Sequence, residues 1–469
     1  MVSKPIAPPW TDSSKNLVHD LARHFTRTAA AIMTTRGYHH ELLQQHVGPS
    51  EIAQPIGSRN ANSPVNPDKK QAKAKATNLQ SLPIYPDKQG KFAPGIVQNI
   101  RPMIALLCGR RGESRGASGE LTHFFFAPNK RSSQMIRLAL KLRRRRTLHT
   151  ICSIPKVLDD AQPICDTHSS STENNKDKDA VKKKVINDIL FADHNIALSR
   201  HTYRRLLAAG VAKNKLSMIY PGIEIPKLPT EKEIEHIRAA FGFGTHEYIV
   251  LFAGDYEFSD AARTVALCAQ QMLSDTDPSV ALRFVYACRT KTAAAEQQKK
   301  EIQDLLLPRH ADKVTFLGDL SQYSPSAQRP NDRPQTDRIG ILDLLSCVDV
   351  NVMPTSRLYA KMDLPLVLIE SIARGVPVIV ADTGSISEVI ADPAAGLRVP
   401  EHDAPALAKA IMSTTLERMD HAIQGKGQHM RYATRTRDVA LKHFDIRKIA
   451  QRYESLYAEL NEKSRSAIL

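Results

Sequence analysis

Residues 364–390, LPLVLIESIARGVPVIVADTGSISEVI, combine a carboxylate with two places where a helix could begin. The carboxylate is Glu370, within an otherwise apolar helical pattern, and a second helix is expected to begin near residues 382–385, DTGS. A helix N-terminus presents unpaired N–H groups and the positive end of the helix dipole, and both favour phosphate binding. The segment therefore predicts a site for phosphate or pyrophosphate, as in a nucleotide-type ligand.

The same segment indicates the elements that would position these groups. Pro365 suits the first position of a helix, and Gly375 supplies a left-handed residue to end it. Residues 376–380 form an apolar run bounded by turn signals, which predicts a buried strand. In a parallel sheet, this order would aim both helix N-termini at one crevice beside the carboxyl ends of the strands.

The pattern around Glu370 alone leaves two interpretations open. If Glu370 faces a cleft, burial of its carboxylate is costly unless hydroxyl or N–H groups, such as those of a nucleotide ribose, hydrogen-bond to it. Alternatively, Glu370, Ser371 and Arg374 form one solvated helix face, with a Glu-to-Arg pair worth a few tenths of a kcal/mol.

These motifs resemble the donor-site signature of glycosyltransferase family 4, the retaining sugar transferases of GT-B fold. In that family a helix with a Glu-x7-Glu pair precedes a Gly-Val-Pro-Val strand and a Gly-Gly-x-Pro-Glu turn. Here Glu370 stands for the second Glu, residues 375–378 read GVPV, and residues 384–388 read GSISE. The resemblance continues at residues 396–400, and weaker similarity to other parts of the family pattern extends over residues 199–211 and 218–223.

The resemblance implies an α/β protein of GT-B fold, with two doubly wound Rossmann-like domains whose parallel sheets face a cleft. A length of 469 residues also exceeds one ordinary core, and short apolar runs alternate with helical patterns. We expect an N-terminal acceptor domain at 1–222, with polar inserts at about 45–99 and 159–184. A nucleotide-sugar donor domain would span 223–440, with an insert at about 321–338, and residues 441–469 would pack back on the first domain as a C-terminal helix.

The implied activity is transfer of a hexose from a nucleotide sugar to a lipid or polysaccharide acceptor, with retention of anomeric configuration. Glu370 would bind the donor nucleotide. The donor phosphates would be bound by the backbone amides of Leu366, Val367, Gly384 and Ser385. Ser13, Ser14 and Asn16 occupy the position of the family's glycine-rich loop and could contact the acceptor or the donor sugar, but an ordinary helix N-cap is equally consistent with them.

The sequence departs from the family pattern at four positions. Met362 stands where the family has its first Glu, which meets the donor sugar, and Cys152 stands where it often has a His that faces the transferred sugar. Asp255 and Asp260 fall near the family's Arg and Lys, which neutralise the donor pyrophosphate. Carboxylates at these positions would repel a diphosphate, whose charge must be stabilised in the transition state.

Other residues could compensate for these losses. His123, in LTHFFFAPN, matches a different family position at a strand end near the cleft, and an ordinary core or surface histidine is the alternative. Three cations near other strand ends could take over the phosphate role, with surface solvation as the alternative for each: Arg289, Lys291 and Lys361. The rival hypothesis is a catalytically inactive GT-B protein that binds nucleotide, glycan or a protein partner as a scaffold.

The formal net charge of the chain is +16, with a pI near 9.5. Residues 101–150 concentrate this charge, with twelve Lys or Arg against two Glu. Within them, Arg131 to Arg146, RSSQMIRLALKLRRRR, predicts a basic amphipathic helix that could lie on an anionic membrane surface, or else a domain helix with a solvated basic face. No nucleic-acid motif accompanies the charge, so nucleic-acid binding is not expected.

The remaining composition excludes several classes of protein. No run of about 18 apolar residues appears and the N-terminus lacks a secretory signal, so we expect a cytoplasmic protein, either soluble or peripheral on the inner face of a membrane. The six cysteines form no CxxC pair, which argues against a disulfide framework or a zinc site. No cluster with metal-ligand spacing is visible and the resembling class generally works without a bound metal, so no cofactor is expected.

Overall fold

The computed structural model describes residues 1, 13–36, 38, 79–85, 121–127, 130, 133–134, 136–137, 146–155, 158, 185–257, 259–275, 281–290, 292–318, 320, 340–355, 357–358, 362–423 and 426–466, with the backbone alone for 417–432 and 463–466. The strands are β1 (Ala30–Thr35), β2 (Leu79–Tyr85), β3 (Leu121–Phe126), β4 (Arg146–Ile151), β5 (His194–Ala197), β6 (Leu216–Met218), β7 (Tyr248–Phe252), β8 (Leu282–Ala287), β9 (Val314–Leu317), β10 (Val350–Met353), β11 (Val378–Ala381) and β12 (Gly396–Val399). The α-helices are α1 (Ser13–His24), α7 (Arg200–Ala208), α8 (Glu231–Ala240), α9 (Ala261–Asp275), α10 (Ala293–His310), α11 (Ile341–Cys347), α12 (Leu366–Ala373), α13 (Ala404–Ile423), α14 (Lys426–His443) and α15 (Ile446–Ser466).

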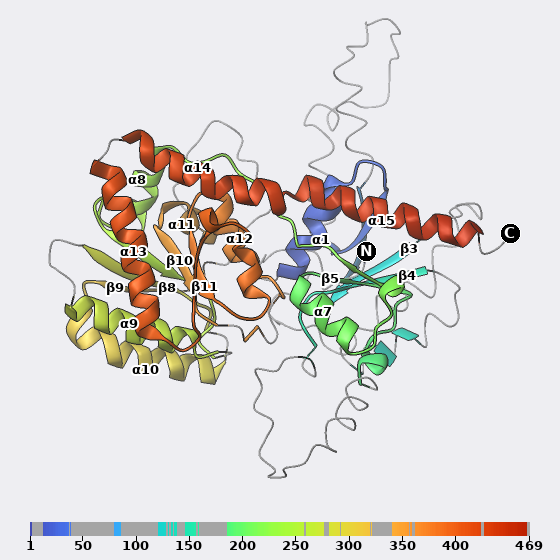
Figure 1. Cartoon of the computed structure of the whole chain (residues 1–469), viewed down its shortest axis with the longest axis horizontal. Coiled ribbons are helices and arrows are strands. Elements are labelled where there is room, and N and C mark those ends of the chain that lie inside the picture. Colours follow the sequence, from blue (N-terminus) through green and yellow to red (C-terminus); the bar gives the residue numbers. More distant parts are fainter. Residues whose placement is uncertain are drawn as a thin grey trace, which may run out of the picture.

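The C-terminal domain is built on a six-stranded parallel sheet in the order β12-β11-β10-β7-β8-β9, with helices on both faces (Figure 1). Every residue of β7, β10 and β11 is buried, as expected of strands covered on both faces. Helices α9, α10 and α13 pack on one face, and α8 and α11 pack on the other. The strand order reverses between β7 and β10, so the carboxyl ends of these two strands form the switch point at which such sheets bind ligands.

The N-terminal domain contains a four-stranded parallel sheet in the order β3-β4-β5-β6 and a parallel pair of β1 and β2. Helices α1 and α15 pack on one face of the larger sheet, and α7 packs on the other. The apolar cluster under α1 and α15 continues into α12 of the second domain, where it includes Leu366, Leu368 and Ile369. The two domains therefore share one apolar core at their junction.

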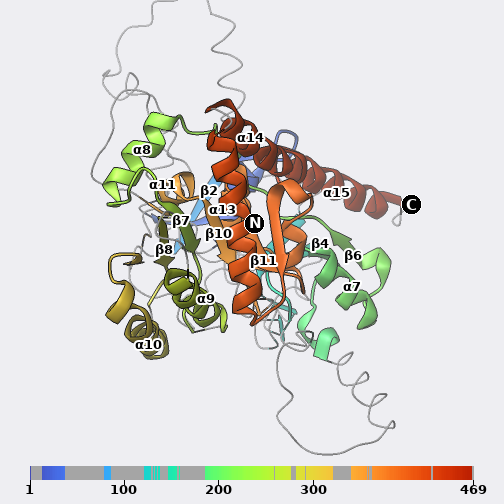
Figure 2. The same ribbon diagram turned by 60° about the vertical axis from the view of Figure 1, so that its left-hand side comes forward.

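The chain crosses between the domains twice. Residues 219–226 lead from β6 into the second domain, and α14 and α15 lead back along the molecule (Figures 1 and 2). The crossings are joined where Ile223 N–H donates to the carbonyl of Phe444 and Ile446 N–H donates to the carbonyl of Ile223, each at 2.9 Å. On the first domain, one carboxylate oxygen of Glu454 in α15 accepts hydrogen bonds at 2.9, 2.6 and 2.8 Å from the successive backbone N–H groups of Thr26, Arg27 and Thr28. The boundaries at residues 222 and 440 stay predictions.

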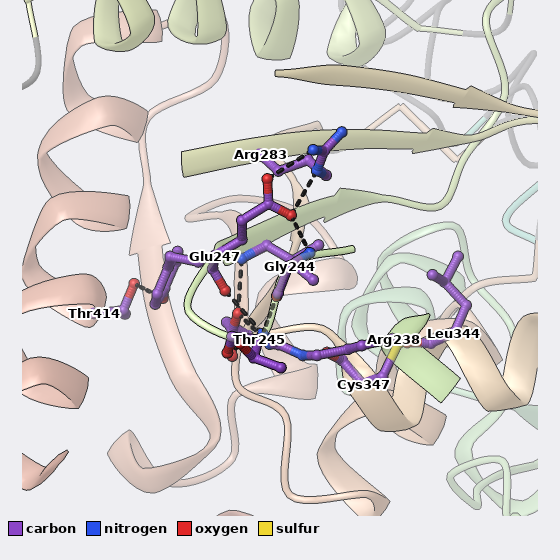
Figure 3. Close-up of polar contacts among 11 residues, drawn as sticks. Arg238, Gly244, Thr245, Glu247, Arg283, Leu344, Cys347 and Thr414 are labelled. Carbon is purple, nitrogen blue, oxygen red and sulfur yellow. Dashed lines mark hydrogen bonds and ion pairs between the residues drawn. The ribbon is translucent and has the colours of Figure 1, made fainter. Parts of the chain in front are cut away.

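A buried arginine connects β7 and β10 at their amino ends, opposite to the switch-point edge (Figure 3). Arg238 of α8 is 3% exposed, and its guanidinium donates to Asp349 Oδ2 at 2.8 Å and to the carbonyls of Cys347 and Glu247, both at 2.9 Å. Asp349 Oδ2 also accepts the N–H of Ile249 at 2.7 Å. Because Asp349 precedes β10 and Ile249 lies in β7, this network fixes the two strands that frame the switch point.

The structure corrects four local expectations. The insert at about 45–99 contains β2, which pairs with β1 although its own sequence is only partly apolar. The helix expected near 382–385 is a four-residue 3₁₀-helix, Ile386–Val389, and the backbone of Asp392 before Pro393 is extended. Pro365 is the N-cap of α12 rather than its first residue, and Arg146 begins β4 instead of ending a helix.

Several predicted features lie outside the described residues: the inserts at 159–184 and 321–338, most of 131–146, Lys291 and Lys361. No helix in the described part of the chain is long and apolar enough to cross a membrane.

Candidate functional site

Glu370 lies in the second turn of α12 and is 9% exposed. Among the described residues, no hydrogen bond reaches its carboxylate; only its backbone carbonyl accepts one, from Arg374 Nη1 at 3.1 Å. Burial raises the pKa of Glu370 to about 7, an effect opposed by Arg374 and reinforced by Asp20 of α1. Ser371 is fully buried, so the alternative of a solvated helix face is not formed. A buried carboxylate without a protein donor is suited to bind hydroxyl groups of a ligand.

The four amides predicted to bind phosphate belong to two segments that are linked through a serine. Leu366 and Val367 begin α12, and the first amides of a helix have no acceptor within it. Gly384 turns the chain after β11 with φ +67°, a left-handed conformation that favours glycine. Ser385 is 5% exposed, and its Oγ donates to the carbonyl of Asp363 at 2.6 Å. This bond holds the 384–385 turn beside the loop that leads into α12.

The carboxyl ends of the two sheets meet at the domain junction. Cys152, the residue after β4, is 5% exposed, and its carbonyl accepts the N–H of Asp363 at 2.8 Å. Asp363 lies between β10 and α12, so the bond joins the end of a first-domain strand to the loop before α12 in the second domain. Met362, at the position of the family's first Glu, is 6% exposed within the shared apolar core and offers no charged group to a sugar.

An ion pair spans the carboxyl ends of β7 and β8. Asp255 and Arg289 are paired by an isolated β-bridge, and Arg289 Nη2 lies 3.3 Å from Asp255 Oδ1. The Arg289 side chain is 31% exposed, against 9% for Asp255, so the buried carboxylate holds a guanidinium that solvent and ligands can reach. Asp260 lies at the start of α9, where its carbonyl accepts the N–H of Thr264 at 2.9 Å. The structure thus brings one predicted cation, Arg289, together with Asp255, whereas Asp260 Oδ2 lies 3.7 Å from His402 Nδ1.

His123 lies in the interior of β3 rather than at its end and is 1% exposed. Its Nδ1 lies 2.7 Å from Tyr457 Oη of α15, and its Nε2 lies 2.8 Å from Thr150 Oγ1 of β4. Burial lowers the pKa of His123 well below its ordinary value, so the ring is neutral. The placement at a strand end was wrong, because His123 is the third residue of β3. Because both ring nitrogens have protein partners, the geometry favours a structural histidine that joins the C-terminal helix to the sheet.

Ser13 and Ser14 are the first residues of α1, and Asn16 is 7% exposed in the first turn of this helix. Helix α1 packs into the apolar core shared with α12, and Asp20 in its second turn is close enough to influence the pKa of Glu370. The start of α1 therefore belongs to the same junction, while a contact of these residues with sugar stays a prediction. Nowhere in the described ranges do three or more His, Cys, Asp or Glu gather so that they could hold a metal ion.

Residues 247–415 match the family model described as Glycosyl transferases group 1. This stretch begins just before β7 and ends in α13, so it includes Glu370 and both predicted phosphate segments. The D-inositol 3-phosphate glycosyltransferase of Nocardia farcinica is 25% identical over 222 residues, and that of Mycobacteroides abscessus is 26% identical over 198 residues. These alignments cover 47% and 42% of this chain, and the chain spans only 44% and 38% of the two relatives.

The C-terminal domain thus resembles the group 1 glycosyltransferases over residues 247–415. Solved structures extend the similarity in fold to the whole chain. Sucrose-phosphate synthase from Thermosynechococcus elongatus has a TM-score of 0.61 at 17% identity and covers 98% of both chains. The Anabaena protein HepE in complex with UDP-glucose has a TM-score of 0.57 at 16% identity, over 97% of this chain and 98% of that one. The chain thus has the GT-B fold of two Rossmann-like domains.

Two carboxylates of this candidate site had no predicted role. Asp363 is fully buried between the domains, and Glu388 contacts the helix that follows β5. Glu388 ends the GSISE turn, so the motif could have drawn attention to it. Asp363 has no such signal, because its partners are more than 150 residues away in the sequence.

Proposed function

We propose that this protein transfers a hexose from a nucleotide sugar to an acceptor, with the donor bound at the carboxyl edge of the six-stranded sheet. The observation that carries the proposal is Glu370, a buried carboxylate that has no hydrogen-bond donor among the described residues. Two neighbouring ribose hydroxyls would each donate to it and so offset the cost of burying its charge. The UDP-glucose complex of HepE, a protein of similar fold, supports a nucleotide sugar as the donor.

The donor phosphates are proposed to lie between the start of α12 and the turn after β11. Backbone amides would contact them there, those of Leu366, Val367, Gly384 and Ser385. Charge on the departing diphosphate must be stabilised in the transition state, and these amides supply fixed dipoles for that purpose. Arg289, held in place by Asp255, would add a full positive charge. Attack by the acceptor from the side of the leaving group would give retention of configuration.

The acceptor is proposed to bind the N-terminal domain and to be a lipid-linked sugar or a growing polysaccharide. The basic segment 131–146 motivates the lipid alternative, through attraction to an anionic membrane surface. Three of its described residues are engaged within the first domain. Ser133 Oγ donates to the carbonyl of Ile189 at 2.6 Å, Arg137 donates to the carbonyl of Leu190, and Ile136 packs in an apolar cluster. Binding of the full chain to anionic vesicles that weakens steeply with salt would support membrane contact, and binding that salt does not change would remove it.

A catalytically inactive GT-B protein is the second candidate, and the ion pair of Asp255 and Arg289 is the observation that favours it. In this alternative Arg289 neutralises Asp255 and is not available to phosphate. The ring of His123, whose two nitrogens contact Tyr457 and Thr150, is also consistent with a protein that has the fold but no catalytic activity.

Calorimetric titration with UDP-, GDP- and ADP-sugars tests the proposal, with wild type and Glu370→Ala compared side by side. Micromolar binding of one donor that is lost in the variant supports the transferase, and a search for the acceptor would follow. If a folded wild-type protein binds none of the three donors, the inactive scaffold replaces the transferase as the better account.

A further inference from the structure

The N-terminus of α7, in the first domain, is held by two carboxylates of the second domain. Asp363 Oδ2 accepts the hydroxyl of Ser199 at 2.5 Å, and its Oδ1 accepts the hydroxyl of Thr202 at 2.9 Å. Glu388 accepts two backbone N–H groups, from Arg200 to Oε2 at 2.8 Å and from His201 to Oε1 at 2.6 Å. Four hydrogen bonds therefore cross the domain junction at one helix end.

Glu388 completes the cap of α7. Ser199 is the N-cap and its Oγ accepts the N–H of Thr202 at 2.9 Å, which satisfies one of the amides that a helix N-terminus leaves unpaired. The amides of Arg200 and His201 have no acceptor within their own helix, and Glu388 supplies both. The negative carboxylate also lies at the positive end of the helix dipole. The same carboxylate accepts the hydroxyl of Tyr220, from the interdomain crossing, at 2.9 Å.

Both carboxylates belong to the segments proposed to hold the donor phosphates. Asp363 lies three residues before Leu366, and Glu388 lies three residues after Ser385. Ser385 Oγ donates to the carbonyl of Asp363, which ties the two segments to each other. The N–H of Asp363 is bound in turn by the carbonyl of Cys152 in the first domain. A movement of α7 away from the second domain must therefore break the bonds that fix both phosphate segments.

We propose that Asp363 and Glu388 are positioning residues that dock both phosphate segments on α7, so that the shape of the donor site depends on the contact between the domains. This inference rests on the proposed function for its effect on the donor, but the docking itself is independent of that function. Neither side chain needs to touch the donor, because each acts through the backbone of the segment that carries it. Loss of one carboxylate should release the other, since both bind the same helix end.

Hydrogen exchange of the full chain, measured by mass spectrometry on peptides that cover 199–203 and 362–365, tests the docking without any ligand. In Glu388→Gln the amides of Arg200 and His201 should exchange roughly 10-fold faster or more, because a hydrogen bond to a charged group is lost. The decisive signal is the amide of Asp363, which should also exchange faster although its acceptor, the Cys152 carbonyl, is unchanged. Faster exchange at 199–203 alone would overturn the proposal and reduce Glu388 to a local helix cap.

Glu247→Gln is the matched control for Glu388→Gln. Glu247 also accepts a backbone N–H, that of Gly244 at 2.6 Å, but it lies at the opposite edge of the same domain (Figure 3). This variant should speed exchange near Gly244 and leave 199–203 and 362–365 as in the wild type. Asp363→Asn should reproduce the effect of Glu388→Gln from the other carboxylate. If it does not fold, Thr202→Val takes its place, since it removes one donor to Asp363 and keeps the carboxylate.

Calorimetry with the nucleotide sugar that binds best separates the two proposals. Glu388→Gln should weaken donor binding roughly 10-fold, and Glu247→Gln should leave it unchanged. Equal donor affinity in the wild type and in Glu388→Gln would overturn the positioning role. If the wild type binds no nucleotide sugar, the proposed function fails, and the exchange of the Asp363 amide still decides whether the carboxylates dock the two domains.

Discussion

Proton release on donor binding gives a direct test of Glu370. Burial raises the pKa of its carboxyl from 4.5 to about 7, so about half of the molecules carry this proton near pH 7. Ribose hydroxyls would donate to the ionised form, and binding should therefore lower the pKa and release about half a proton per donor near pH 7. The release should fall to about a tenth of a proton near pH 8, where the free protein is already ionised.

The assay is titration calorimetry in two buffers that differ in ionisation enthalpy, because the difference in heat gives the number of protons released. Glu370→Gln keeps the size of the side chain and removes the titration, so any donor that it still binds should release no proton. A wild-type release near zero at pH 7, or the same release from Glu370→Gln, would refute the assignment of Glu370 to the donor.

The same pKa shift has a consequence for stability, and its sign is fixed. A carboxyl whose pKa is raised by folding contributes stability below its unfolded pKa of 4.5, and this contribution is lost as the pH rises through 7. The shift corresponds to about 3 kcal/mol. Relative to wild type, Glu370→Gln should therefore gain up to about 3 kcal/mol of unfolding free energy between about pH 4 and pH 8, measured by urea denaturation.

Five further substitutions address the ion pair near the site and the packing of the fold. Asp255→Asn should tighten donor binding and Arg289→Gln should weaken it, each by about fivefold. Removal of one charge in a partly solvated site changes the binding free energy by about 1 kcal/mol. If calorimetry shows that both variants change the affinity in the same direction, the proposed role of the ion pair is contradicted. Gly375→Ala should lose about 2–4 kcal/mol in denaturation, since φ is +79° and the new Cβ would lie 2.7 Å from Ala433 Cβ. Gly242→Ala is its control, with φ +72° and open space around the Cβ, and should lose only about 1–2 kcal/mol. Glu454→Gln should cost about 2 kcal/mol and speed hydrogen exchange at 26–28, and unchanged exchange there would show that α15 is held by its apolar contacts alone.

The sheet of the second domain was predictable because its strands are buried on both faces. Such strands appear in the sequence as continuous apolar runs, and the run at 376–380 located β11 at 378–381. The strand β2 was missed for the opposite reason. Its residues are mostly only partly buried, and its partner β1 lies more than 40 residues earlier in the chain, so no local pattern reports the pairing.

The parts of the candidate site that lie within one short sequence motif were predictable. Glu370 and the turn at 384–388 belong to such a motif, and the structure places both at the domain junction. The structural role of His123 could not be foreseen, because a sequence does not show that Tyr457, more than 300 residues later, will contact its ring nitrogen. Asp363 was missed for the same reason, since its role depends on Ser199 and on α7. Contacts between distant segments thus account for the failures.

Two of the four departures from the family pattern, Asp255 and Asp260, concern the phosphates of the proposed donor, and they predict an unusual dependence on phosphate number. Asp255 and Asp260 stand near the positions of two family cations and Arg289 pairs with Asp255, so these three side chains together carry one negative charge. Glu370, proposed to meet the ribose, is retained. In a site with two cations the second phosphate of a nucleotide adds much of the affinity; here the backbone amides must offset the repulsion from the carboxylates. We expect a nucleoside monophosphate and the corresponding diphosphate to bind within about threefold of each other, a difference below about 1 kcal/mol, by calorimetry. A preference for the diphosphate of about 30-fold or more, about 2 kcal/mol, would show that cations outside these three positions complete the phosphate site.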